Sequence, residues 1–157
     1  MKTKFLNCGQ DGRLISMQLE ELIGGLEEEE NLIIKDYMSL DKKRITSEKI
    51  ITQLSKLDYE SLMKPQLIAK LLGYENFDNY EEVGVYPKGY RILSKIPRMP
   101  SNIVENLVKT FKSFQYILAA DIEELDKVEG IGEVRAQTIK QSLKRMQEQY
   151  VFDNIMF

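Results

Sequence analysis

Apolar residues recur at helical spacing along the first half of the chain. Isoleucines and leucines lie three or four positions apart over residues 15–26, with an interruption at Gly24-Gly25, and the pattern resumes after a run of four glutamates. This spacing gathers apolar side chains on one face of a helix. Thr46-Ser47 is suited to cap a third helix, and Pro65 is suited to the first position of a further one. The pattern therefore predicts a small helical bundle.

The helical period lapses between residues 74 and 90. This segment reads YENFDNYEEVGVYPKGY and is rich in aromatic, asparagine, glycine and proline residues. Such a composition without a helical period is typical of a loop. We therefore expect two units, a helical linker domain over residues 1–80 and a second domain over residues 81–157. Units of this size bury only a modest core, so each is expected to contact the other.

Beyond Tyr90 the apolar pattern repeats. Each copy has two apolar residues three positions apart, a tight turn with an apolar residue at its centre, and a second helix with an apolar face. The copies are offset by 32 residues, and the matching pairs are Leu93 and Leu125, Ile96 and Val128, Met99 and Ile131, Val104 and Ala136, and Leu107 and Ile139. A fixed offset indicates two equivalent structural units. The predicted fold class is all-α, a linker bundle followed by paired helical hairpins.

The second copy carries the clearest local signals. Asp121 and Glu124 have the spacing of a capping box at the start of a short helix. The turn that follows is Gly130-Ile131-Gly132. Ile131 is expected to fill the core between the two helices, while the glycine on each side permits a positive φ and lets another backbone approach closely.

The helix after this turn is expected to bury one face and to expose a basic one. The expected inward positions are Val134, Ala136, Ile139, Leu143 and Met146, and the expected solvent-facing cations are Arg135, Lys140, Lys144 and Arg145. The N–H groups of a glycine turn and a helix N-terminus form a positive site suited to a phosphate. Such a site contacts backbone rather than bases, so binding should be independent of sequence. The alternative is that the glycines serve only a tight hairpin.

Composition restricts the chemistry. The chain has no histidine and one cysteine, Cys8, which removes the commonest metal ligand, the commonest general base and any internal disulfide. We therefore expect neither a zinc site nor Ser-His-Asp or Cys-His catalysis. The carboxylates are plentiful but lack a recognisable ligand spacing, so we expect no metal and no cofactor, while counting alone leaves a hard-cation or acid/base site open. The net charge of −3 divides into −4 for residues 1–90 and +1 for residues 91–157. No apolar run approaches the roughly 18 residues of a membrane span, and the first residues lack a secretory signal, so a cytoplasmic protein without a membrane partner is expected.

The second copy resembles a helix-hairpin-helix motif. The paired copies resemble the tandem, RuvA domain 2-like module with which many DNA repair and recombination proteins hold DNA phosphates. The first copy departs from the motif, because Arg98 and Pro100 stand where the second copy has Gly130 and Gly132. Pro100 lacks an N–H group, so the first turn should offer a poorer amide site, and Arg98 is expected to add a side-chain contact.

This degenerate first copy, together with DGRLISMQLEELIGG and PKGYRILSKIPRMP, resembles the C-terminal region of the DisA family of DNA integrity scanning proteins. The resemblance runs from about Asp11 to Gln149. Family members carry an N-terminal diadenylate cyclase domain that makes cyclic di-AMP from ATP through Asp-Gly-Ala and Arg-His-Arg motifs. Asp11-Gly12-Arg13 does not match the first motif, and a chain without histidine lacks the second. We therefore expect a fragment, or a natural short form, without the catalytic domain.

The resemblance implies a DNA-binding, nucleoid-associated region that prefers branched DNA such as Holliday junctions and transmits its occupancy through the linker to the cyclase domain. The expected DNA-binding residues are Gly130, Ile131, Gly132, Glu133, Val134, Arg135, Lys140 and Lys144 in the second hairpin, and Arg98, Ser101 and Asn102 in the first. Two alternatives remain open. One is a protein-association or homo-oligomer module that uses the apolar tail YVFDNIMF. The other, less favoured, is a helix-hairpin-helix DNA glycosylase.

Overall fold

The structure is a computed structural model that describes residues 9–40, 45–74 and 84–155. Within these ranges the chain forms helices, turns and loops and contains no strand, which confirms the all-α prediction. The helices are α2 Gly9–Ile23, α3 Leu26–Tyr37, α4 Ser47–Leu54, α5 Tyr59–Leu62, α6 Pro65–Leu71, α7 Tyr90–Leu93, α8 Ser101–Phe111, α9 Phe114–Ala119, α10 Ile122–Asp126 and α11 Glu133–Ile155.

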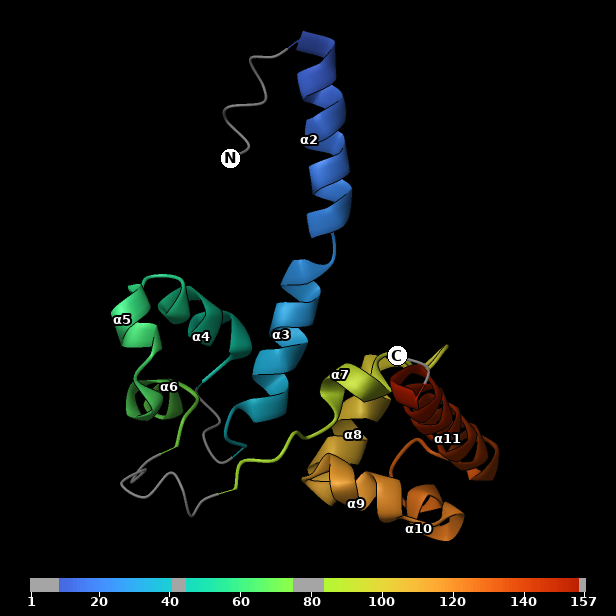
Figure 1. Ribbon diagram of the computed structural model, residues 1–157. Coiled ribbons are helices and arrows are strands. Elements are labelled where there is room, and N and C mark those ends of the chain that lie inside the picture. Colours follow the sequence, from blue (N-terminus) through green and yellow to red (C-terminus); the bar gives the residue numbers. More distant parts are fainter. Residues whose placement is uncertain (1–8, 41–44, 75–83, 156–157) are drawn as a thin grey trace.

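The helices α2 and α3 follow one another as a long arm. They are separated at Gly24-Gly25, as predicted, and Gly25 has a φ of 90°. Figure 1 shows α2 extending away from the other helices, while α3 lies between the α4–α6 group and the α7–α11 group. The side chains of Leu14 and Met17 on α2 are exposed. The arm formed by α2 and α3 therefore contacts the other described helices mainly through α3.

The helices α4, α5 and α6 form a cluster beside α3. The Thr46 side chain accepts the Lys49 N–H at 3.4 Å and caps α4, and Pro65 begins α6. Both features follow the sequence prediction. Ile50 of α4 is fully buried, and α4 contacts α3 and α6. A hydrogen bond of 2.8 Å from the Ser39 N–H to the Leu72 carbonyl joins the end of this cluster to the residues after α3.

The helices α7 to α11 form the predicted pair of hairpins around one core. The first hairpin is α7 and α8, the second is α10 and α11, and the short helix α9 connects them. Nine of the ten repeat positions are buried in a single cluster, and the tenth, Met99, packs against it. The turns also match, since the Met99 N–H donates to the Ile96 carbonyl at 3.2 Å and the Ile131 N–H donates to the Val128 carbonyl at 2.9 Å.

Two expectations about α11 are wrong. Val134 is 80% exposed rather than inward-facing. It lies two positions from buried Ala136, and two residues span about 200° around a helix, so the two side chains point to opposite faces. Lys140 is only partly exposed, because its ammonium donates to the Leu118 carbonyl at the end of α9, at 2.9 Å.

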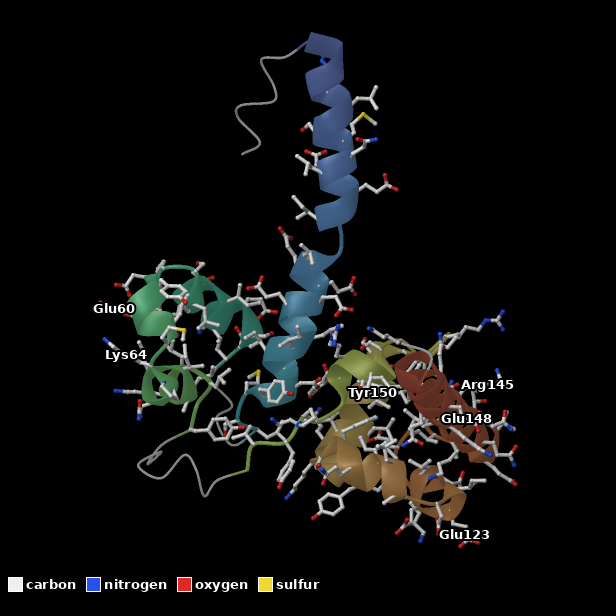
Figure 2. The ribbon with its side chains drawn as sticks, viewed as in Figure 1. Glu60, Lys64, Glu123, Arg145, Glu148 and Tyr150 are labelled. Atoms are coloured by element: carbon white, nitrogen blue, oxygen red, sulfur yellow. The ribbon has the colours of Figure 1, made fainter. Side chains whose placement is uncertain are left out.

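The surface of α11 away from the core is charged. Figure 2 shows Arg145 and Glu148 on the outer side of this helix. The Lys144 ammonium lies 3.9 Å from the Glu148 carboxylate, an exposed pair that contributes little to stability. Of the helices in the described ranges, none is both long enough and apolar enough to cross a membrane.

The predicted boundary between the two domains, at residues 80 and 81, lies outside the described residues. The chain is described again from Gly84, which precedes α7. The Phe114 N–H at the start of α9 donates to the Pro87 carbonyl at 3.0 Å, so this approach to α7 is bound to the hairpin module. The linker helix α3 contacts α7 directly. The two units therefore share an interface between α3 and the first hairpin.

Candidate nucleic-acid interface

The turn of the second hairpin places a glycine where no other residue fits well. Gly130 has a φ of 81°, a conformation that favours glycine. A Cβ added there would lie 2.6 Å from the Cδ1 atom of Ile103 on α8. Ile131 is buried beneath the turn, as predicted. The turn is braced by the Arg135 guanidinium, which donates to the Gly130 carbonyl, and by the Asn106 amide, which donates to the Glu129 carbonyl at 2.9 Å.

Gly132 matches the sequence prediction only in part. It does not adopt a positive φ, and a Cβ added there would meet nothing within 4 Å. Gly132 directly precedes α11, and its carbonyl accepts the Ala136 N–H at 2.9 Å. Across the described part of the chain, no acceptor pairs with the N–H groups of residues 132–135. These donors lie at the N-terminus of a 23-residue helix, which is the positive end of its dipole.

The first hairpin offers fewer donors at the equivalent place. Pro100 replaces Gly132 and has no N–H group. The Ile103 N–H, which is equivalent to that of Arg135, turns back to the Pro100 carbonyl at 3.0 Å. The exposed residues Ser101 and Asn102 begin α8 and retain the remaining N–H groups of this turn. The first turn therefore has fewer unpaired N–H groups than the second in the described structure.

Arg98 occupies the position equivalent to Gly130 and has a left-handed backbone, with a φ of 59°. A side chain in this conformation costs roughly 1–2 kcal/mol, whereas glycine there costs mainly its extra unfolded-state entropy. We therefore expect Arg98→Gly to raise the free energy of unfolding by about 0.5–1 kcal/mol. Urea denaturation followed by circular dichroism measures this change. A lower midpoint for the glycine variant would show that the Arg98 side chain makes a compensating contact.

The two hairpin turns face a common groove. This groove has a volume of about 550 Å³ and is lined by Pro97, Arg98 and Met99 from the first turn and by Gly132, Glu133, Val134, Arg135 and Thr138 from the second. It therefore brings together five of the predicted DNA-binding residues, from segments that lie more than 30 positions apart. The exposed Val134 side chain also lies here. Sequence reasoning missed Thr138, whose position on the exposed side of α11 gives no signal of a groove.

Charges around the groove are mixed. Arg98 and Arg135 contribute cations, whereas Glu133 places a carboxylate in the first turn of α11. Lys140 lies apart from the groove with its ammonium at the end of α9, and Lys144 lies roughly 18 Å along α11 from Gly132 at a rise of 1.5 Å per residue. Amides and arginines at the turns are thus better placed to act together on one phosphate group than the two lysines are.

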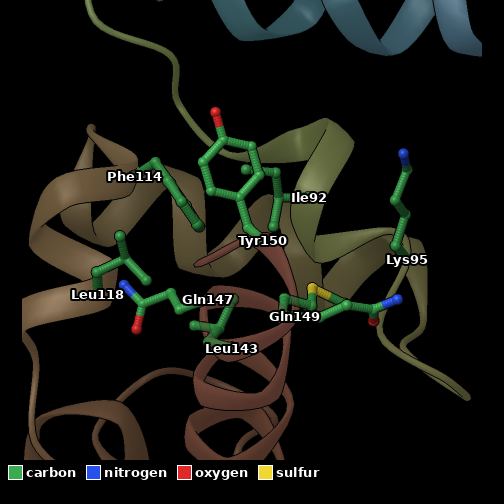
Figure 3. Close-up of a pocket in the computed structure, with 9 residues that line it drawn as sticks. Ile92, Lys95, Phe114, Leu118, Leu143, Gln147, Gln149 and Tyr150 are labelled. Atoms are coloured by element: carbon green, nitrogen blue, oxygen red, sulfur yellow. The ribbon is translucent and has the colours of Figure 1, made fainter. Parts of the chain in front are cut away.

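A second groove is apolar and lies away from the hairpin turns. Its volume is about 710 Å³. Phe114 and Leu118 of α9 line one part, and Leu143 and Tyr150 of α11 line another (Figure 3). Tyr150 is the first residue of the predicted apolar tail YVFDNIMF, and the side chains of this tail from Val151 onward lie outside the described part. This groove has the character of a protein contact rather than of a site for an anion.

Two hairpins on one core, with equivalent turns at one groove, define a tandem helix-hairpin-helix protein. The family described as SAM-like Helix-hairpin-helix tandem matches residues 90–145. A second family, described as DisA bacterial checkpoint controller linker region, matches residues 1–80. The chain belongs to the DisA family.

Curated relatives agree with this assignment. A DNA integrity scanning protein DisA from Carboxydothermus hydrogenoformans is 50% identical over 141 residues, which are 90% of this chain and 40% of the relative. The protein of the same name from Acetivibrio thermocellus is 49% identical over 147 residues, covering 93% and 40% of the two chains. The one from Clostridioides difficile is 45% identical over 148 residues, covering 94% and 41%. The chain thus spans about 40% of the length of these relatives.

Proposed function

We propose that residues 90–145 bind DNA through its phosphates, without sequence preference. One observation carries this proposal: residues 132–135, whose N–H groups have no acceptor in the described part of the chain, line the groove that both hairpin turns share. The site combines backbone donors with the side chains of Arg98 and Arg135. Donors of this kind position a phosphate and read no base edge. Of the residues predicted from the sequence, those proposed at the centre of the contact are Arg98, Gly132 and Arg135, which line the groove.

We further propose that this region prefers branched DNA, acts at the nucleoid, and couples its occupancy through the linker to a diadenylate cyclase domain of a full-length family member. Membership of the DisA family supports this view, because the relatives are named DNA integrity scanning proteins. The chain itself is proposed to be non-catalytic.

A binding titration tests the proposal. Fluorescence anisotropy of labelled four-way junction, duplex and single-stranded DNA, measured at two salt concentrations, should give the tightest binding for the junction and weaker binding of every DNA at higher salt. Duplexes of unrelated sequence should bind equally. Affinity that differs strongly between duplex sequences would contradict phosphate recognition, and an absence of binding to all three DNAs would contradict the function itself.

The second candidate function is association with another copy of the chain. The apolar groove of about 710 Å³ between α9 and α11 favours it. Sedimentation of the protein alone at low and high salt tests this association. Apolar association weakens little with salt, whereas the DNA binding measured in the titration should weaken strongly. A concentration-dependent dimer that persists at high salt, together with an absence of DNA binding, would favour this second function.

A further inference from the structure

The first hairpin lacks the helix cap that the second hairpin has. In the second, the Asp121 carboxylate accepts the Glu124 N–H at 2.8 Å, and the Glu124 carboxylate accepts the Asp121 N–H at 2.9 Å. The equivalent of Asp121 in the first hairpin is Gly89, 32 positions earlier, which has no side chain. A Cβ at Gly89 would lie 2.7 Å from the Phe114 ring, and its φ is 108°. The first hairpin therefore has no room for a cap of its own.

Asp36 of the linker helix α3 makes the missing contact. Its Oδ1 atom accepts the N–H groups of Gly89 at 2.8 Å and of Tyr90 at 2.6 Å, at the start of α7. Both the N–H and the ammonium of Lys88 donate to the Asp36 carbonyl, at 3.2 and 3.1 Å. Asp36 is only 5% exposed. A carboxylate at a helix N-terminus and an ammonium at a helix C-terminus are each favourable, so the two helix ends complement one another.

The Asp36 carboxyl and the Lys88 ammonium are both buried, and burial shifts the pKa of each. Burial raises the pKa of the Asp36 carboxyl, while the hydrogen bonds from the Gly89 and Tyr90 amides oppose that rise. Desolvation likewise lowers the pKa of the Lys88 ammonium. A buried group of this kind is costly to leave unpaired. Loss of the Asp36 side chain would leave two N–H groups at the start of α7 without their acceptor.

Other charged side chains of α3 and the first hairpin meet closer to the surface. Arg91 and Lys95 both pair with Glu29, the latter at 3.7 Å, and the Lys35 ammonium lies 5.9 Å from the centre of the Tyr90 ring. Exposed ion pairs are screened by solvent and contribute little. Asp36 and its partner Lys88 are thus the buried charged residues of this interface within the described chain.

We infer that Asp36 is a positioning residue of the DNA-binding module: by capping α7 from the linker, it fixes the orientation of α3 relative to the first hairpin. Its consequence for DNA rests on the proposed function. The helix α7 leads directly into the turn that carries Arg98, so displacement of this turn and displacement of the linker are linked. Such coupling is reciprocal. If the contact between Asp36 and α7 changes the affinity of the turn for DNA by some factor, DNA binding must change the equilibrium constant of that contact by the same factor.

Three variants of this chain test the inference without DNA. Asp36→Ala removes the acceptor, Asp36→Asn keeps an Oδ1 acceptor without the charge, and Asp121→Ala removes the corresponding cap of the second hairpin as a matched control. Spin labels at Glu30→Cys on α3 and Gln141→Cys on α11, in a Cys8→Ser background, report the distance between the linker and the module.

We expect Asp36→Ala to broaden the distance distribution and to speed amide hydrogen exchange at Tyr90 roughly fivefold, the effect of losing an ordinary helix cap. Asp36→Asn and Asp121→Ala should keep the parent's distribution. An unchanged distribution in Asp36→Ala, or equal broadening in Asp121→Ala, would overturn the inference. If Asp36→Ala does not fold, Asp36→Ser, which keeps a shorter acceptor, is expected to broaden the distribution, and a parent-like result would overturn the inference in the same way.

A second measurement separates the inference from the proposed function. We expect Arg98→Ala to weaken junction binding roughly fivefold in the parent, and by less in the Asp36→Ala background, because the turn is no longer held in place. Equal effects in the two backgrounds would mean that Asp36 does not position Arg98. If the parent binds no DNA, the proposed function is wrong, and the distance measurement alone decides whether Asp36 orients the linker.

Discussion

Replacing Gly130 with alanine should lower the free energy of unfolding by about 2–4 kcal/mol, the largest effect we expect from a single methyl group in this protein. Two costs combine. The φ of 81° is unfavourable for any residue with a Cβ, and the new Cβ would lie 2.6 Å from the Ile103 side chain. Ile103 is buried in the common core, so it has little freedom to move away. Urea denaturation of the purified variant measures the loss.

The neighbouring glycine provides a matched control for this experiment. Gly132 lies two residues further along, its added Cβ meets nothing within 4 Å, and it has no positive φ. We expect Gly132→Ala to cost no more than about 1 kcal/mol, the size of an unfavourable change next to a helix start. Equal destabilisation by the two alanines would contradict the distinct environments of these glycines.

Much of the hairpin module could be predicted because its signals are local. The capping box at Asp121 and Glu124, the glycine turn and the 32-residue repeat each involve residues close in sequence or related by a fixed offset, and the structure contains all three. The inward position predicted for Val134 is wrong for a geometric reason, because Val134 and Ala136 are two residues apart and lie on opposite faces of α11.

The remaining features depend on tertiary structure. Lys140 contacts a carbonyl 22 positions earlier, and Asp36 caps a helix that begins 54 positions later. No pattern within a helix shows such partners, because each needs the relative placement of two elements. The groove between the hairpin turns likewise depends on the relative placement of two elements. The sequence predicted its residues through the motif, but only the packing of both hairpins on one core makes their turns neighbours.

The second large effect concerns the open space at Gly132. Gly132→Leu should weaken binding to all DNA sequences alike, by roughly tenfold or more, since a bulky side chain would block approach of a phosphate to the N–H groups of residues 132–135. The loss should not depend on base sequence. Matching circular dichroism and melting temperature would show that the variant is folded, and the open surroundings of Gly132 favour that outcome.

Salt dependence separates the amides from the cations. With about four phosphate contacts, the slope of log affinity against log salt should be on the order of −3 to −4, and each cation that neutralises a phosphate should contribute about 0.9. Arg98→Gln, at the groove, should therefore flatten the slope by about one unit. Lys144→Gln should do so only if DNA extends along α11. Neutral amides release no paired counterions, so Gly132→Leu should change the affinity more than the slope.

Arg13→Gln provides the charge-matched control, because Arg13 is exposed on α2, which Figure 1 shows extending away from the hairpins. Its slope should equal that of the parent. The slopes of all variants are best measured with one duplex over a common salt series.

If folded Gly132→Leu and Arg98→Gln both bind with the parent's affinity at every salt concentration, the glycine turn serves only the hairpin. The phosphate contact must then lie elsewhere on the module. If instead Arg13→Gln flattens the slope as much as Arg98→Gln does, the salt dependence reflects overall charge rather than contacts at the groove.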